Sequence, residues 1–228
     1  MQYSPTSLNL AYRSRKSHLI TNHSGLNTGQ RIMKRIFDIS VAGTALIFAL
    51  PLLLVVAIMI VLETPGGVFF FQERYGEGGE KFKIFKFRSM VANADKMVDD
   101  VKEYDDDGKT IYKRPNDMRV TRVGKIIRKT SLDELPQLLN VILGDMSIVG
   151  PRPEVTRIVE EEYEAWQHER FNVPQGITGW WQVTSRSEKE CYQATDKDIY
   201  YVRNYSFWLD IKIILMTIPA LLKGKGAF

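Results

Sequence analysis

The chain has 228 residues, enough for one domain of ordinary size with a tail and an anchor. Its 44% hydrophobic and 25% charged residues exclude a disordered or collagen-like protein, and one cysteine excludes a disulfide scaffold. The formal net charge is +4, but residues 1–38 carry six basic side chains and one acid, leaving 25 basic and 26 acidic side chains elsewhere. The basic excess therefore belongs to the N-terminal region, and no nucleic-acid-binding fold is expected.

The N-terminal part of the chain contains a polar tail and an apolar run. Residues 1–30 are rich in Ser, Asn and Gly and contain no acid, which predicts a disordered basic tail. Residues 39–62 are 24 positions without a charge. As a straight helix they would measure about 36 Å, against about 30 Å for the hydrocarbon core of a bilayer. The run lies too far along the chain and is too long for a cleaved signal peptide.

Pro51 lies in the middle of this apolar run and predicts a kink or break, because proline lacks the N–H that a helix interior needs. Each half would then measure roughly 18 Å and reach only partway across a bilayer. The flanking cations Arg31, Lys34 and Arg35 favour a cytoplasmic N-terminus. A re-entrant helix keeps both ends on that side, whereas a straight span separates them. Spanning helices tolerate proline, so these residues leave both topologies open.

The rest of the chain predicts a small domain of strands and helices. Two strands, the second alternating basic and apolar residues, flank a glycine-rich tract that predicts a hairpin. The expected strands are 68–72 and 81–88, and the expected helices are 92–102, 132–143, 154–170, 189–203 and 207–222, with an acidic loop at 105–108. The last helix is apolar nearly all round, which is typical of a helix in the membrane interface or in the core.

Residues 131–137, SLDELPQ, form the most informative motif. Ser131 and Glu134 have the spacing of a capping box, which predicts the start of a helix. Pro136 agrees, since the first turn of a helix needs no backbone N–H. On these grounds alone the motif is a helix cap.

The neighbours of this motif suggest phosphate chemistry. Arg128 lies just upstream, and Gln137 falls one turn after Asp133. A carboxylate at a helix start, beside an arginine, suits a metal ion and a phosphate together. In residues 150–154, GPRPE, two prolines stiffen the backbone around Arg152 and favour a guanidinium clamp for phosphate, or a structural arginine in a rigid turn.

Residues 176–183, GITGWWQV, form a third motif. Two glycines permit a tight turn and close backbone approach. The side chains of Trp180 and Trp181 suit three roles equally well: anchoring at a membrane interface, stacking on a base and filling the core.

Taken together, these motifs resemble the bacterial sugar transferase family, the monotopic polyprenyl-phosphate phosphoglycosyl transferases, and within it the undecaprenyl-phosphate hexose-1-phosphate transferases. The resemblance covers about residues 33–217 and has many motifs in the right order. It is carried by KRIFD at 34–38, Pro51, GVFF at 67–70, KFRSM at 86–90, RKTSLDELPQ at 128–137, GDMSIVGPRP at 144–153, Asp198 and SFWLD at 206–210.

The resemblance implies an α+β, mostly helical fold. A re-entrant membrane helix, broken at Pro51, would occupy residues 31–62, after the tail of residues 1–30. Residues 63–228 would form a small cytosolic catalytic domain with interfacial amphipathic helices. The protein would lie in the bacterial inner membrane, with this domain on the cytoplasmic face.

The family also implies an activity. A sugar-1-phosphate would pass from a UDP-sugar to undecaprenyl phosphate with Mg²⁺ and release of UMP, as the first membrane step of exopolysaccharide, O-antigen or lipopolysaccharide synthesis. By this resemblance Asp133 is the nucleophile and a metal ligand, and Glu134 completes the dyad. Arg128, Gln137 and Arg152 would hold phosphate oxygens. The implied partners are the two substrates and membrane lipid; a homodimer stays open.

Two alternatives differ in chemistry. The chain could be a non-catalytic membrane scaffold of a glycan-assembly complex, in which case substitution of Asp133 would leave its function intact. It could also use another nucleotide donor, or let the lipid attack directly without a covalent intermediate. A phosphosugar trapped on Asp133 would argue against direct attack.

Overall fold

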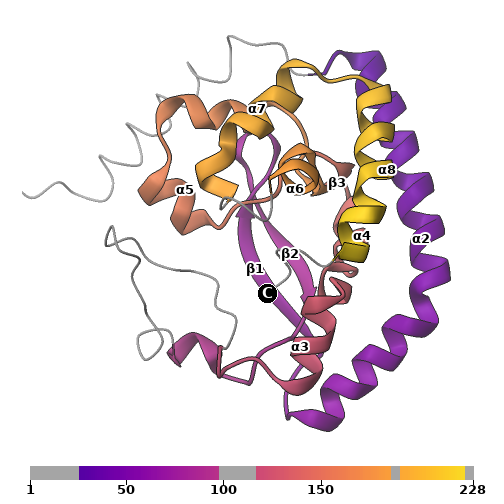
Figure 1. Ribbon diagram of the computed structural model, residues 1–228, viewed down its shortest axis with the longest axis vertical. Coiled ribbons are helices and arrows are strands. Elements are labelled where there is room, and N and C mark those ends of the chain that lie inside the picture. The colour runs from indigo at the N-terminus through magenta and orange to yellow at the C-terminus, as the bar shows by residue number, and fades with distance from the viewer. Residues whose placement is uncertain (1–25, 98–116, 186–190, 224–228) are drawn as a thin grey trace, which may run out of the picture.

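The computed structural model describes residues 26–97, 117–185 and 191–223 (Figure 1). Its helices are α2 (Thr28–Glu63), α3 (Arg122–Lys129), α4 (Gln137–Leu143), α5 (Thr156–Glu162), α6 (Trp180–Thr184), α7 (Thr195–Arg203) and α8 (Phe207–Lys223). The strands are β1 (Phe69–Tyr75), β2 (Lys81–Phe87), β3 (Ser147–Val149) and β4 (Gly176–Thr178). The 3₁₀ segments are η1 (Glu77–Gly79), η2 (Ala94–Met97), η4 (Leu132–Glu134), η5 (Ala165–Asn172) and η6 (Cys191–Ala194). The predicted class, α+β and mostly helical, is confirmed.

The predicted hairpin is confirmed and is longer than expected. β1 and β2 pair antiparallel, with Tyr75 opposite Lys81 beside the turn. Gly78 and Gly79 make that turn with φ values of 65° and 70°, a left-handed conformation that glycine adopts at little cost. The second, smaller sheet pairs β3 and β4 in parallel.

α2 is one continuous helix of 36 residues with Pro51 inside it. It begins at a capping box between Asn27 and Gln30, so residues 28–30, expected in the tail, are helical. Figure 1 shows that the helix bends along its length, but it continues through Pro51 and is not broken there. Among the described residues, α2 alone is long and apolar enough to cross a membrane.

The first half of α2 is locked to the domain by buried charges. Lys34 Nζ donates to Asp210 Oδ2 and to the Val149 carbonyl, each at 2.8 Å. Asp38 Oδ1 accepts from Ser147 Oγ at 2.9 Å. These bonds tie α2 to α8 and to β3, and α8 runs alongside α2 in Figure 1.

The second half of α2 returns to the same domain. Val56 and Ile60 are buried against a cluster that includes Ile127 of α3. At the end of the helix, Glu63 accepts from the backbone N–H of Arg122 at 2.7 Å and so caps the start of α3. Both ends of α2 therefore bind one folded unit.

The central core lies between the long helices and the small parallel sheet. Leu138 and Val141 of α4 pack with Val149 of β3, Tyr201 of α7 and Ile213 of α8. This cluster fixes α4, and with it the turn that precedes α4, against the sheet.

Several predicted helices are divided. The helix expected at 132–143 is a 3₁₀ turn followed by α4, because Pro136 interrupts the hydrogen bonding at the start of α4. The helix expected at 154–170 separates into α5 and η5 at Tyr163, whose backbone is extended. Within the described residues, the helix expected at 189–203 is η6 followed by α7. The helix expected at 207–222 is confirmed as α8.

Other expectations fall partly outside the described residues. In the segment predicted as helix 92–102, Ala94–Met97 is a 3₁₀ turn, and residues 98–102 lie outside the described part. The acidic loop at 105–108 and tail residues 1–25 also lie outside it.

Candidate active site

Asp133 and Glu134 lie in η4, on a turn between α3 and α4 that contacts β2. Ser131 adopts φ 56° and ψ 19°, and its side chain makes no capping hydrogen bond. The predicted capping box is therefore wrong: the left-handed Ser131 turns the chain after α3, whose end is capped by Thr130. A left-handed conformation at a residue with a Cβ is strained, and such strain concentrates at functional sites.

Two cations hold Glu134. Lys86 Nζ lies 3.0 Å from Glu134 Oε1, and the Arg152 guanidinium donates to both carboxylate oxygens. Burial alone would raise the pKa of Glu134, but the charges of Arg152 and Lys86 outweigh it and hold the pKa well below its usual range. Glu134 is therefore a fixed anion that orients two cations.

Asp133 is buried without such partners. Its side chain accepts no hydrogen bond from any described residue, although Lys86, Arg128 and Arg152 are near enough to act on its charge. Burial, followed by repulsion from Glu134, raises the pKa of Asp133 from 3.8 to about 6. The carboxyl group is thus mostly ionised at neutral pH, and its oxygens accept no hydrogen bond within the described protein.

The other predicted phosphate ligands differ in accessibility. Arg128, at the end of α3, donates from Nε to Ser89 Oγ at 2.9 Å, and its charge acts on Asp133. Gln137 begins α4 and is 1% exposed, and its amide nitrogen has no acceptor in the described protein. The structure thus gathers Arg128 and Arg152 around the dyad, whereas Gln137 lies in the interior.

Arg152 is positioned from behind by Arg170. The Arg170 guanidinium is fully buried, donates to the Arg152 carbonyl and forms an ion pair of 2.6 Å with Asp198. It also donates to the Tyr163 hydroxyl. Because these bonds hold the backbone of the proline-flanked turn, the Arg152 side chain reaches Glu134 from a rigid base.

The glycines of the third motif serve the same turn. A Cβ on Gly176 would lie 2.1 Å from the Gly150 nitrogen, and one on Gly179 would lie 2.2 Å from the Gly150 oxygen. The backbones of β4 and of the turn carrying Arg152 therefore approach too closely for any side chain. The predicted role, close backbone approach, is confirmed.

The two tryptophans of that motif have separate surroundings. Trp181 is buried and packs with Cys191 and Ala194. Trp180 is half-buried and stacks on Tyr200, with Lys212 Nζ 5.4 Å from its ring centroid. Core filling is therefore the role of Trp181.

The donor set fits magnesium held jointly with a substrate. The described residues contain no group of three or more His, Cys, Asp and Glu side chains that could hold a metal alone. Mg²⁺ is commonly bound by one or two carboxylates together with substrate phosphates and water. Asp133 supplies such a carboxylate, with lone pairs that no described donor occupies.

Lys86 and Arg170 are absent from the residues that the sequence predicted. Lys86 belongs to the strand predicted from alternating basic and apolar residues; its side chain is 17% exposed and is paired with Glu134. The alternation of basic and apolar residues assigns Lys86 to the basic face of the strand, but it does not indicate which residues pack against that face. Arg170 gave no local signal, because its partner Asp198 lies 28 positions later in the sequence.

Comparison with known proteins agrees with this geometry. Residues 29–224 match the family described as Bacterial sugar transferase. The UDP-galactose-lipid carrier transferase of Erwinia amylovora is 40% identical over 94% of this chain and 44% of its own length. A UDP-N-acetylgalactosamine-undecaprenyl-phosphate N-acetylgalactosaminephosphotransferase of Aeromonas hydrophila is 42% identical over 86% and 45%, respectively.

A shorter relative is matched over most of its length. The exopolysaccharide production protein ExoY of Sinorhizobium fredii is 38% identical over 86% of this chain and 88% of its own length. The chain spans about half the length of the first two relatives. The profile match over most of the chain, together with these identities, establishes that the chain belongs to the bacterial sugar transferase family.

Proposed function

We propose that this protein transfers a sugar-1-phosphate from a UDP-sugar to undecaprenyl phosphate, giving undecaprenyl-diphosphate-sugar and UMP. The observation that carries the proposal is the contrast within the dyad: Asp133 is a buried carboxylate without a hydrogen-bond donor in the described protein, beside Glu134 held by two cations. The name of the Aeromonas hydrophila relative supports the substrate classes, because it contains both a UDP-sugar and undecaprenyl phosphate.

In the first step an Asp133 oxygen attacks the phosphorus that bears the sugar. An oxygen–phosphorus bond forms to Asp133, the bond to the bridging oxygen breaks, and UMP leaves with that electron pair. Lys86, Arg128 and Arg152 neutralise the diphosphate as charge develops on the leaving phosphate. The raised pKa of Asp133, about 6, leaves the attacking carboxylate ionised near pH 7.

In the second step a phosphate oxygen of the lipid attacks the same phosphorus and releases Asp133 as a carboxylate. No water or net proton is consumed, so the chemistry balances without another reactant. Glu134 keeps Lys86 and Arg152 oriented toward successive phosphates throughout. Two steps also keep the two anionic substrates from being crowded together at one site.

Mg²⁺ is proposed as the cofactor. Asp133 would hold it together with substrate phosphates, and the ion would supply neutralisation of the diphosphate charge. Arg128 and Arg152 act on the same charge from the protein side.

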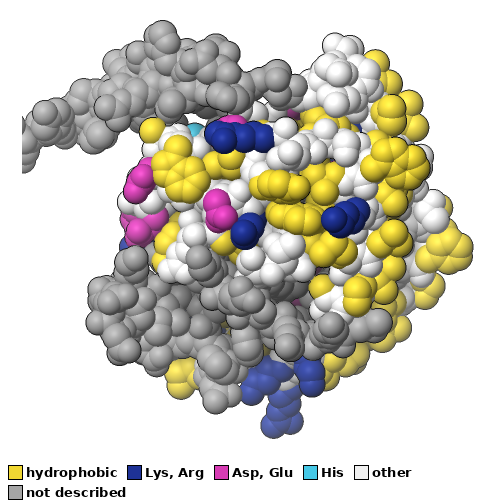
Figure 2. Space-filling model, turned by 45° about the horizontal axis from the view of Figure 1, so that its top comes forward, with side chains coloured by type: hydrophobic (Ala, Val, Ile, Leu, Met, Phe, Trp, Pro, Cys, Tyr) yellow, Lys and Arg dark blue, Asp and Glu magenta, His cyan; other side chains and the backbone are white. Residues whose placement is uncertain are grey.

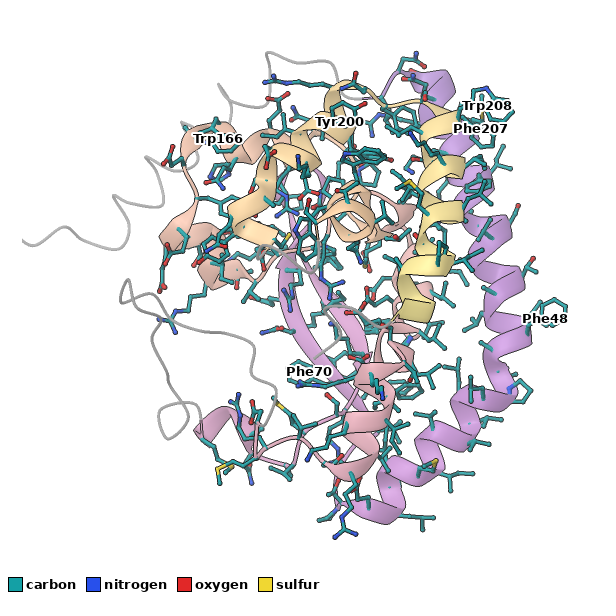
Figure 3. The ribbon with its side chains drawn as sticks, viewed as in Figure 1. Phe48, Phe70, Trp166, Tyr200, Phe207 and Trp208 are labelled. Carbon is teal, nitrogen blue, oxygen red and sulfur yellow. The ribbon has the colours of Figure 1, made fainter. Side chains whose placement is uncertain are left out.

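We also propose that α2 enters the membrane and returns. Its middle exposes large apolar side chains, and Figure 3 shows Phe48 pointing away from the rest of the molecule. Figure 2 shows hydrophobic side chains along the edge of the molecule where α2 lies. Both ends of α2 bind the same domain, through Lys34 and Glu63, which supports a re-entrant path because a straight span would separate them.

The remaining membrane contacts follow from this topology. α8 exposes Trp208, Leu215 and Ile218, which supports a position in the interface beside α2. Residues 63–228 would then form the catalytic domain on the cytoplasmic face of the inner membrane, after a tail and the membrane helix. Synthesis of an exopolysaccharide or O-antigen-type glycan is the proposed role, since relatives bear exopolysaccharide names.

The test is UMP release from a panel of UDP-sugars with undecaprenyl phosphate and Mg²⁺. We expect lipid-dependent release from one donor, and its loss in Asp133→Asn. The matched control is Asp196→Asn, which makes the same chemical change at an exposed carboxylate. Release that survives in Asp133→Asn would remove the nucleophile role, and release from no donor would contradict the proposed activity.

A further inference from the structure

A mainly apolar pocket adjoins the dyad. It has a volume of about 140 Å³ and lies where the η4–α4 segment, β4, α6 and α8 meet. Leu135, Ile177, Val183 and Ala220 supply apolar walls, and Glu134 lines the pocket as well. The cavity therefore brings hydrocarbon surface next to the phosphate chemistry of the candidate active site.

The polar groups in the wall are largely engaged within the protein. The hydroxyls of Thr178 and Thr217 share a hydrogen bond of 2.7 Å. The side-chain nitrogen of Gln182 donates to the Ile177 carbonyl at 2.8 Å, whereas its Oε1 has no donor in the described protein. A sugar ring needs several free hydrogen-bonding groups, whereas a hydrocarbon segment needs only the apolar wall that remains.

The position of α8 connects this pocket to the membrane surface. Thr217 and Ala220 face the pocket, while Leu215 and Ile218, on neighbouring turns of the same helix, are exposed. If α8 lies in the interface as proposed, only the thickness of one helix separates lipid from the pocket. Glu134, which lines the pocket, is paired with the cations Lys86 and Arg152.

We infer that this pocket holds the isoprene units next to the phosphate of the lipid acceptor. The acceptor's phosphate would then lie beside Lys86 and Arg152, within reach of a phosphosugar on Asp133. The inference rests on the proposed function for the identity of the acceptor, a polyprenyl phosphate. It adds the residues that recognise its hydrocarbon part: Val183 and Ala220 as walls that a prenyl methyl group touches.

The test uses two pocket variants and one control on the full chain in lipid nanodiscs. Ala220→Phe fills the cavity, and Val183→Thr makes its wall polar at nearly constant volume. Leu215→Phe repeats the enlargement on the exposed side of the same helix. Binding of geranyl phosphate, of inorganic phosphate and of the UDP-sugar is measured by calorimetry, and the KM values of undecaprenyl phosphate and the UDP-sugar by UMP release.

We expect both pocket variants to weaken geranyl phosphate binding and to raise the acceptor KM about tenfold, the effect of losing one or two buried methylene-sized contacts. Binding of inorganic phosphate and of the UDP-sugar should stay within about twofold, which also shows that the variants are folded. Leu215→Phe should match the wild type.

Two results would overturn the inference. A rise in the KM and Kd of the UDP-sugar, with the acceptor unaffected, would assign the pocket to the sugar. Unchanged binding of every probe in both pocket variants would show that the pocket is not used. Wild-type protein that binds geranyl phosphate through this pocket but releases no UMP would instead contradict the proposed function and leave the pocket assignment in place.

Discussion

Two buried charge clusters in this protein are built in opposite ways. Beneath α2, Lys34 is surrounded by acceptors, and Asp210 accepts from both Lys34 and the Tyr201 hydroxyl. In the candidate active site, Glu134 is similarly satisfied, but Asp133 beside it accepts no hydrogen bond from the described protein. The first cluster completes its hydrogen bonds within the protein, and the second leaves one anion for a ligand.

The difference teaches how burial can serve either stability or chemistry. A buried ion pair gains little over an apolar pair, but losing one partner is costly because a charge is left uncompensated. A buried carboxylate without a donor is held in an unfavourable state that substrate or metal can relieve. The following predictions separate these two uses of burial.

The largest expected effect is on stability, at the closed cluster. Lys34→Met should lower the free energy of unfolding by about 3–5 kcal/mol, because Asp210 would remain buried without its cation. Arg31→Met, one turn earlier, breaks an exposed pair with Glu77 and should cost at most about 1 kcal/mol. Urea unfolding in detergent measures both; equal losses would show that the buried pair has no special role.

The next effect is on turnover, at the open cluster. Arg152→Lys should lower kcat/KM about 100-fold, since an ammonium cannot bond both Glu134 oxygens and a phosphate in the planar arrangement of a guanidinium. Arg157→Lys, at an exposed pair with Glu161, is the control and should leave turnover unchanged. Steady-state UMP release measures both variants. Full activity in Arg152→Lys would exclude a guanidinium clamp on phosphate at this position.

A smaller effect, a gain in the stability of the protein, is expected when the buried charge of Asp133 is removed. The pKa of Asp133 is 3.8 when unperturbed and about 6 when folded, so the unfolded chain ionises first and stability falls between these pH values. Asp133→Asn should therefore stabilise the protein by about 1–3 kcal/mol at pH 7 and by little at pH 4. Unfolding curves at both pH values measure this difference. A variant that is less stable than the wild type at pH 7 would show that the buried charge of Asp133 does not destabilise the protein.

The smallest effect is the acid limb of the activity profile. Protonated Asp133 is a poor nucleophile, so kcat/KM should fall as the pH drops through about 6 and be about tenfold lower at pH 5 than at pH 7. Glu134, whose pKa lies well below its usual range, should stay ionised there. A profile that is flat down to pH 5 would exclude Asp133 as the titrating group.

Local patterns were reliable where they describe one element. The alternation of β2 and its glycine-rich turn predicted the hairpin, and the apolar run predicted α8 within one residue of its observed end. The capping-box spacing of Ser131 and Glu134 failed because the carboxylate is drawn away to Lys86 and Arg152, which lie 48 and 18 positions away in the chain. Long-range charge pairing thus overrode a cap worth about 1 kcal/mol.

The sequence by itself determined the α+β class, the long apolar run of residues 39–62, and the place of Asp133, Glu134 and Arg152 in motifs suited to phosphate chemistry. Only the tertiary structure decided that the charge of Glu134 is paired with two cations while Asp133 has no such partner. It also decided that Arg170 supports the turn of Arg152. Only it brought both ends of α2 to one domain. The physical reason is that burial and charge pairing depend on residues far apart in the chain, whereas periodicity and turn chemistry act between near neighbours.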